Sequence, residues 1–298
     1  MKTSNWFAPI FIVLWSTGFI IARYGMPYSE PMTFLFIRFS GVVICLIPVL
    51  LWLKPVWPSG KQGMHIAVAG ALIQFGYLGG VWAAVKQGMP AGLAALIVGL
   101  QPILTALLAS TVSERVTSRQ WLGLALGLAG VALVLFAKIH LEGITFASVC
   151  FAFAGMFSIT FGTLYQKRFC PSFDLRTGSV IQFSISAFLC LIAMMMFETR
   201  EIQWTMPMIG ALLWGIIPIS LGAMSLWFIL LQRGDATKVS SVMYLTPPTT
   251  ALMAWLLFDE KLTTSIILGT LITMVGVLIV NQTSFKGWFK TRDNNAHN

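Results

Sequence analysis

The chain has 298 residues, of which 57% are hydrophobic and only 10% are charged, whereas a typical soluble domain carries roughly 25% charged residues. Such a chain cannot cover itself with polar side chains in water, so the composition excludes an ordinary soluble protein and predicts an integral membrane protein. The net charge of +9 does not indicate a nucleic-acid partner, because the basic residues lie at the ends of apolar runs and form no single patch.

Ten apolar segments follow one another along the chain, each close to the roughly 20 residues that cross a bilayer as a helix. They are residues 6–23, 32–53, 64–86, 92–111, 120–138, 145–166, 176–197, 206–231, 238–257 and 264–281. We therefore expect an all-α membrane protein with ten transmembrane helices in contact with lipid. The first segment lacks a convincing signal-peptide cleavage site and is interpreted as a span. The polar tail, 282–298, is expected to be disordered past Thr291.

The distribution of Lys and Arg predicts the orientation, because basic residues favour the cytoplasmic side. With a cytoplasmic N-terminus, 13 of the 19 basic residues lie inside, five lie outside, and Arg38 lies within a span. The opposite orientation would reverse this ratio. Both termini are thus expected to be cytoplasmic, in a multi-pass protein of the inner or plasma membrane.

The sequence repeats with an offset of 146 positions. The matching pairs are Gly76 and Gly222, Gly88 and Gly234, Pro102 and Pro248, Glu114 and Glu260, Thr117 and Thr263, Gly123 and Gly269, and Gly130 and Gly276. We expect a first five-helix unit at 1–141 and a second at 142–281. Because five is odd, the second unit enters the membrane from the opposite side. Two inverted units are a recurrent plan of secondary transporters, with the substrate site near the midplane between them.

The stretch from Trp15 to Phe39, WSTGFIIARYGMPYSEPMTFLFIRF, starts with Trp-Ser, passes through a Pro turn and ends in Arg-Phe. The Pro, Glu and Gly pattern of the fourth and fifth spans recurs in the ninth and tenth. Together with the ten spans, these motifs resemble the EamA domain of the drug/metabolite transporter superfamily, over about residues 6–281. The resemblance implies export or exchange of small metabolites, often amino acids and their relatives, but it specifies no substrate.

Two proline sites lie about halfway along their spans, Gln101-Pro102 and Thr246-Pro247-Pro248. A proline inside a helix removes a backbone hydrogen bond and bends the helix. In lipid, the freed carbonyl must face protein or a wet cavity. We interpret both sites as kinks that expose carbonyls, Gln101 and Thr246 to a central cavity; the alternative is that the prolines only shape packing.

Several polar and aromatic residues lie within spans at helical spacing and are candidates for the cavity wall. Polar groups in mid-membrane should face the bundle, and aromatic faces with a few polar groups suit a partly apolar solute. The alternative is that these rings form interface belts or ordinary core. The candidates are Trp15, Gln74, Tyr77, Phe161, Trp227 and Tyr244.

Arg38 is the only charged residue well inside a predicted span. A charge at that depth is costly, about 3 kcal/mol or more. It could bind a substrate carboxylate, extend outward to the membrane surface, or pair with Glu30. The structural interpretations are favoured here, because the resemblance places this Arg-Phe away from the centre of the bundle.

No Asp or Glu lies in mid-span, although a buried carboxylate is the usual relay for protons or sodium ions. We therefore expect facilitated or exchange transport of a zwitterionic, anionic or neutral solute. Small residues line the fifth and tenth spans and predict close helix packing, either on each other or on a second protomer. A monomer and a homodimer both remain open. The packing positions are Gly123, Gly127, Gly269 and Gly276.

Other classes of protein fit the sequence less well. The histidines and cysteines show no metal-ligand spacing, and no catalytic motif or paired mid-membrane carboxylates are found, so neither an enzyme nor a bound metal or cofactor is expected. A passive channel would need a continuous polar stripe. The function predicted is secondary transport of small metabolites, most plausibly export or exchange of amino acids or related zwitterionic or aromatic compounds. The alternative is import of a vitamin or a nucleotide-linked metabolite such as S-adenosylmethionine.

Overall fold

The computed structural model describes residues 7–89, 94, 97–136, 144–233, 236–258 and 264–293, and these are almost entirely helical. The first group of helices comprises α1 (Phe7–Gly25), α2 (Pro31–Leu53), α3 (Gly60–Gly70), η2 (Ala71–Gly76), α4 (Tyr77–Lys86), α6 (Gln101–Leu107) and α7 (Ser118–Phe136). The second comprises α8 (Phe146–Phe169), α9 (Leu175–Phe197), α10 (Met206–Trp214), η4 (Gly215–Ala223), α11 (Met224–Arg233), α12 (Ala236–Val242), α13 (Thr246–Phe258) and α14 (Thr264–Asp293). Short 3₁₀ turns are η1 (Met26–Tyr28), η3 (Ala109–Val112) and η5 (Met243–Leu245).

Five continuous helices of the described chain are long and apolar enough to cross a membrane. They are Pro31–Leu53, Gly60–Lys86, Phe146–Phe169, Leu175–Phe197 and Met206–Gln232, and shorter apolar helices cover Phe7–Gly18 and Ile267–Val280. The start of the predicted fourth span, residues 92, 93, 95 and 96, lies outside the described residues. The last helix continues to Asp293, beyond the end of the tenth predicted span at 281 and slightly beyond Thr291, where disorder was expected to begin.

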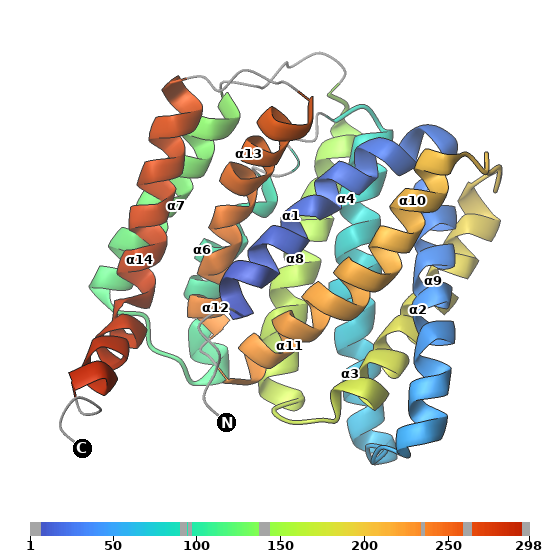
Figure 1. Ribbon diagram of the computed structural model, residues 1–298, viewed down its shortest axis with the longest axis horizontal. Coiled ribbons are helices and arrows are strands. Elements are labelled where there is room, and N and C mark those ends of the chain that lie inside the picture. Colours follow the sequence, from blue (N-terminus) through green and yellow to red (C-terminus); the bar gives the residue numbers. More distant parts are fainter. Residues whose placement is uncertain are drawn as a thin grey trace.

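Two pairs of helices form opposite ends of the bundle. Helix α7 packs along α14 at one end, and α2 packs along α9 at the other (Figure 1). The remaining helices lie between these pairs. Helices α7 and α14 are 146 residues apart in sequence, and so, within a few residues, are α2 and α9. Each pair thus joins segments that match each other in the sequence repeat.

The middle of the bundle repeats one packing pattern. Helix α1 contacts α10, η4, α11 and α13, whereas α8 contacts α3, η2, α4 and α6. Under the 146-residue offset, α1 matches α8, and its four partners match the four partners of α8 in the same order. Helix α1 therefore packs against helices of the second half, and its equivalent α8 packs against helices of the first half.

One end of the α2–α9 pair carries two reciprocal carboxylate contacts. Glu198, at the end of α9, accepts hydrogen bonds from the backbone of Met32 (2.6 Å) and Thr33 (2.7 Å) at the start of α2. Glu30 accepts from the backbone N–H and the hydroxyl of Thr199 at 2.6 and 2.9 Å. Burial by itself would raise the pKa of Glu30, but these hydrogen bonds outweigh it and hold the pKa below its ordinary value. The start of α2 and the connection before it are thereby fixed to the end of α9 and the connection after it.

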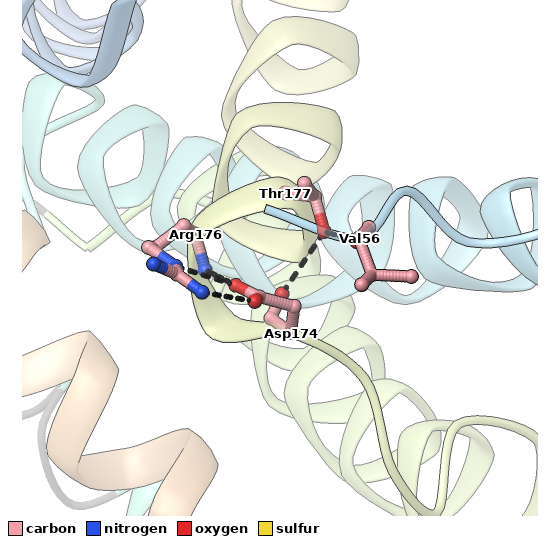
Figure 2. A network of polar contacts seen from close by, with 4 residues as sticks. All are labelled: Val56, Asp174, Arg176 and Thr177. Atoms are coloured by element: carbon pink, nitrogen blue, oxygen red, sulfur yellow. Dashed lines mark hydrogen bonds and ion pairs between the residues drawn. The ribbon is translucent and has the colours of Figure 1, made fainter. Parts of the chain in front are cut away.

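The opposite end of the same pair has a matching but differently built junction. Asp174 caps α9 by accepting from the backbone N–H of Arg176 at 2.9 Å and also forms an ion pair with the Arg176 guanidinium (Figure 2). The Thr177 hydroxyl donates to the Val56 carbonyl at 3.2 Å, which joins the start of α9 to the connection after α2 (Figure 2). Hydrogen bonds thus join α2 and α9 to each other's connections at both ends.

Glu198→Ala is expected to lower the stability of the folded protein by about 1–2 kcal/mol, because it leaves the first donors of α2 without their acceptor. The readout is the thermal unfolding midpoint of the purified protein in detergent. Glu201→Ala is the matched control, because Glu201 is an exposed glutamate in the same connection. Equal midpoints for the two variants would contradict the role assigned to Glu198.

Candidate functional site: a polar and aromatic interior between the two halves

Two helices in the middle of the bundle switch locally to the wider π-helical form. The segment Ala71–Gly76 links α3 to α4, and the segment Gly215–Ala223 links α10 to α11. The two segments occupy equivalent positions under the 146-residue offset. A π-helical turn breaks the regular ladder and leaves carbonyl groups free, which is why such turns are common at functional sites. Sequence reasoning did not predict these segments.

The carbonyls near both π segments receive donors from neighbouring helices. The Ser158 hydroxyl on α8 donates to the Leu72 carbonyl at 3.0 Å, and the Ser186 hydroxyl on α9 donates to the Gly70 carbonyl at 3.1 Å. In the other half, the carbonyl of Gly215 is the acceptor that Arg38 uses. Both segments are thus held by side chains from the helices that pack against them.

Arg38 lies within the bundle, with only 3% of its surface exposed. Its Nε donates to the Gly215 carbonyl at 3.1 Å and to the Ser220 hydroxyl at 2.9 Å. The two structural interpretations of Arg38 were therefore wrong: the side chain does not extend to the membrane surface, and Glu30 bonds to Thr199 and Arg200 instead. The physical reason is the π segment, which offers an internal carbonyl that a regular helix would not.

The aromatic candidates on three helices form one continuous group. Trp15 stacks on Tyr77 with their ring centroids 6.3 Å apart. Phe11 lies between Trp15 (5.3 Å) and Trp227 (5.5 Å). The Arg38 guanidinium carbon lies 5.9 Å from the centroid of the Phe39 ring, and Phe39 belongs to the same buried cluster as Trp15, Tyr77 and Trp227. The structure thus brings Trp15, Tyr77, Trp227 and Arg38 together, and it adds Phe11, which the sequence did not single out.

Both proline sites stand where a helix begins. Helix α6 starts at Gln101 and α13 starts at Thr246, each followed directly by proline. The 3₁₀ turn Met243–Leu245 precedes α13. Proline is well suited to the first turn of a helix, where its missing N–H is not needed. The backbone is also helical at Leu100 before α6 and at Val242 and Thr246 on either side of the 3₁₀ turn, so the interpretation of the prolines as kinks stays a prediction.

Polar groups at these helix starts lie at the junction of the halves. Gln101 is fully buried and donates through Nε2 to the Ser240 hydroxyl at 3.3 Å. The Ser16 hydroxyl on α1 donates to the Thr246 carbonyl, and the Thr250 hydroxyl donates to the Ser16 carbonyl, both at 3.4 Å. These contacts connect α6 to α12 and α1 to α13.

Several buried polar atoms in the interior have no hydrogen-bond partner among the described residues. Burying such an atom without a partner is unfavourable, so each one indicates a place where water or a solute can bind. The atoms on predicted site residues are Gln74 Nε2, Gln101 Oε1, Trp227 Nε1, Tyr244 Oη and Thr246 Oγ1. Thr105 Oγ1, on the same helix as Gln101, joins them.

Two candidates lie elsewhere. Phe161 is 49% exposed and stacks on Phe157 along α8, apart from the buried aromatic group, so its place in the cavity wall stays a prediction. Tyr244 is buried, but its ring packs against Gly127 of α7 in a separate apolar cluster with Leu124 and Val280. It is not part of the aromatic group around Trp15.

The small residues on α7 and α14 bring these two helices into backbone contact. A Cβ on Gly276 would lie 2.5 Å from the Gly127 nitrogen and 2.6 Å from the Gly123 carbonyl oxygen. A Cβ on Gly130 would lie 2.6 Å from the Gly269 carbonyl oxygen. The two glycine stripes therefore face each other within one chain.

The family model that describes the EamA-like transporter family matches this chain twice, over residues 3–136 and 146–282. One relative, the uncharacterized transporter YvbV of Bacillus subtilis, is 28% identical, with 92% of this chain and 90% of the relative aligned. The probable amino-acid metabolite efflux pump of Salmonella typhimurium is 24% identical, with 93% and 94% of the two chains covered.

The fold also has a counterpart among solved structures. One crystal structure superposes with a TM-score of 0.77 at 19% identity, covering 93% of this chain and 96% of the other. Among sequence relatives, the probable amino-acid metabolite efflux pump of Escherichia coli is 25% identical, and the alignment covers 91% of this chain and 92% of that protein. These similarities extend over nearly the full length of the proteins compared.

Proposed function

Because the chain belongs to the EamA-like transporter family, we propose that this multi-pass membrane transporter exports amino acids or related zwitterionic and aromatic metabolites by alternating access. The names of the Salmonella typhimurium and Escherichia coli relatives support export of amino-acid metabolites. The solute would bind between the two halves, where the aromatic group, Arg38 and the unpartnered polar atoms lie.

The repeated packing pattern carries this proposal. We propose that residues 1–141 and 142–281 form two inverted five-helix units, with the tail and the N-terminus in the cytoplasm. The reciprocal contacts of α1 and α8 with the opposite halves support this arrangement. Two equivalent units can exchange conformations, so that the contact of α1 with α13 opens on one side while that of α8 with α6 closes on the other.

The chemistry of the interior supports a solute without a permanent positive charge. In the described part of the chain, every carboxylate lies at a helix end or in a connection, and the interior charge is Arg38. We therefore propose facilitated or exchange transport that a proton gradient does not drive.

The test is efflux from proteoliposomes that contain the purified protein. Vesicles loaded with amino acids, aromatic compounds and nucleosides are assayed with and without a proton gradient, beside protein-free vesicles. Release of amino acids or aromatic metabolites that is independent of the gradient is expected. Strict dependence on the gradient would refute the uncoupled mechanism and would direct attention to Glu30, Glu114 and Glu260.

A further inference from the structure

The buried guanidinium of Arg38 has no counter-ion among the described residues. The two carboxylates at one end of the α2–α9 pair, Glu30 and Glu198, bind backbone and hydroxyl groups there and are not available to Arg38. A buried charge without a partner is strongly unfavourable, and proteins normally avoid it. The position is therefore explained best if an anion from outside the chain provides the missing charge.

A purely structural role would not need an arginine. The neutral Ser186 hydroxyl on α9 has one proton for two acceptors, the Gln182 carbonyl at 2.8 Å and the Gly70 carbonyl at 3.1 Å. Arg38 on α2, in the first half, donates to the Gly215 carbonyl in the second half. Because a neutral side chain stands beside the first π segment, the arginine beside the second introduces a charge that a hydrogen bond to a carbonyl does not itself require.

The geometry leaves the binding end of Arg38 available. Both hydrogen bonds of its side chain, to Gly215 and Ser220, are made by Nε. Within the described chain no acceptor is found for its two terminal nitrogens. A guanidinium fixed at Nε presents these nitrogens as a planar fork, which matches the two oxygens of a carboxylate.

The surroundings of this fork define the rest of the ligand. The Arg38 guanidinium carbon lies 5.9 Å from the Phe39 ring centroid, within the buried cluster that also holds Tyr77, and the Tyr77 ring stacks on Trp15. Phe11 and Trp227 extend the same aromatic group. A ligand bound at Arg38 would therefore place a carboxylate at the guanidinium and an apolar or aromatic part on these rings.

We propose that Arg38 binds the carboxylate of the transported solute through its two terminal nitrogens, so that the transporter selects organic acids and amino acids against the corresponding amides, which lack the carboxylate. This inference rests on the proposed function, since it assigns the selecting residue of the same site. A lysine at position 38 would keep the charge but lose the fork, so it would retain only part of the selectivity.

The test measures selectivity rather than rate alone. Proteoliposomes are loaded with the protein amino acids together with their α-amides, and efflux of every compound is followed by mass spectrometry. The wild-type protein is expected to export at least one amino acid about tenfold faster than its amide, and Arg38→Gln to reduce this ratio to about one. Arg176→Gln, which removes an exposed arginine from its pair with Asp174, is the control and should keep the wild-type ratio.

The outcomes separate the two claims. If Arg38→Gln slows the acid and the amide equally and keeps their ratio, Arg38 is only structural and the inference is wrong. If the wild-type protein releases acids and amides equally, the inference is also wrong, and this arm does not depend on whether the variant folds. If the wild-type protein releases none of the compounds, the proposed function itself fails.

Discussion

Gly276→Val is expected to leave little correctly folded transporter, because the new side chain has no space between α7 and α14. The nearest atoms to a Cβ at this position are the backbone nitrogen of Gly127 and the backbone oxygen of Gly123, at 2.5 and 2.6 Å. Backbone atoms cannot move aside as a side chain can, so the two helices must separate along their contact. We expect the free energy of unfolding to fall by about 3 kcal/mol or more, which is the upper range for overpacked cores.

The measurement is the thermal midpoint of the purified protein in detergent, with size-exclusion profiles to detect misfolded material. A fall of about 6–12 °C corresponds to the expected energy for a chain of this size. Gly210→Val on α10 is the matched control, because a Cβ there would meet nothing within 4 Å. Similar midpoints for the two variants would show that the glycine contact does not hold α7 and α14 together.

Several parts of the fold could be predicted from the sequence because they depend on local chemistry. Apolar length identifies the helices, and proline at Pro102 marks the point where α6 begins. The glycine stripes predict a close helix contact, since only small residues allow backbones to approach so closely. The sequence repeat matches the way in which equivalent helices pack in the structure.

Other features could not be predicted because hydropathy does not distinguish between lipid and protein as an apolar neighbour. Phe161 is half exposed and Trp227 is buried, yet both belong to spans apolar enough to cross a membrane. The π segments shift the register by changing the backbone, and only an indirect signal, Pro218 in the middle of a span, hints at one of them. Because the sequence did not predict the π segments, it also did not predict that the Gly215 carbonyl accepts a hydrogen bond from Arg38 inside the bundle.

A disulfide between α1 and α13 is expected to stop transport almost completely. In a variant whose four native cysteines are replaced by alanine, Ser16→Cys and Thr250→Cys introduce one thiol on each helix at residues whose hydroxyls now join the helices, Ser16 to the Thr246 carbonyl and Thr250 to the Ser16 carbonyl, both at 3.4 Å. Oxidation would fix this contact between the two halves. If transport requires the contact to open in every cycle, efflux should fall to about a tenth or less of the reduced rate, since alternating access cannot proceed with the halves joined.

Each single-cysteine variant is the control, because oxidation cannot join the helices when one thiol is absent, and a reducing agent should restore efflux in the double variant. Gel mobility after proteolysis between residues 16 and 250 would confirm that the disulfide has formed. Undiminished efflux through a fully oxidised protein would mean that solutes pass a fixed α1–α13 contact. A passive channel would then describe the protein better than alternating access, because a channel conducts without any exchange between its two halves.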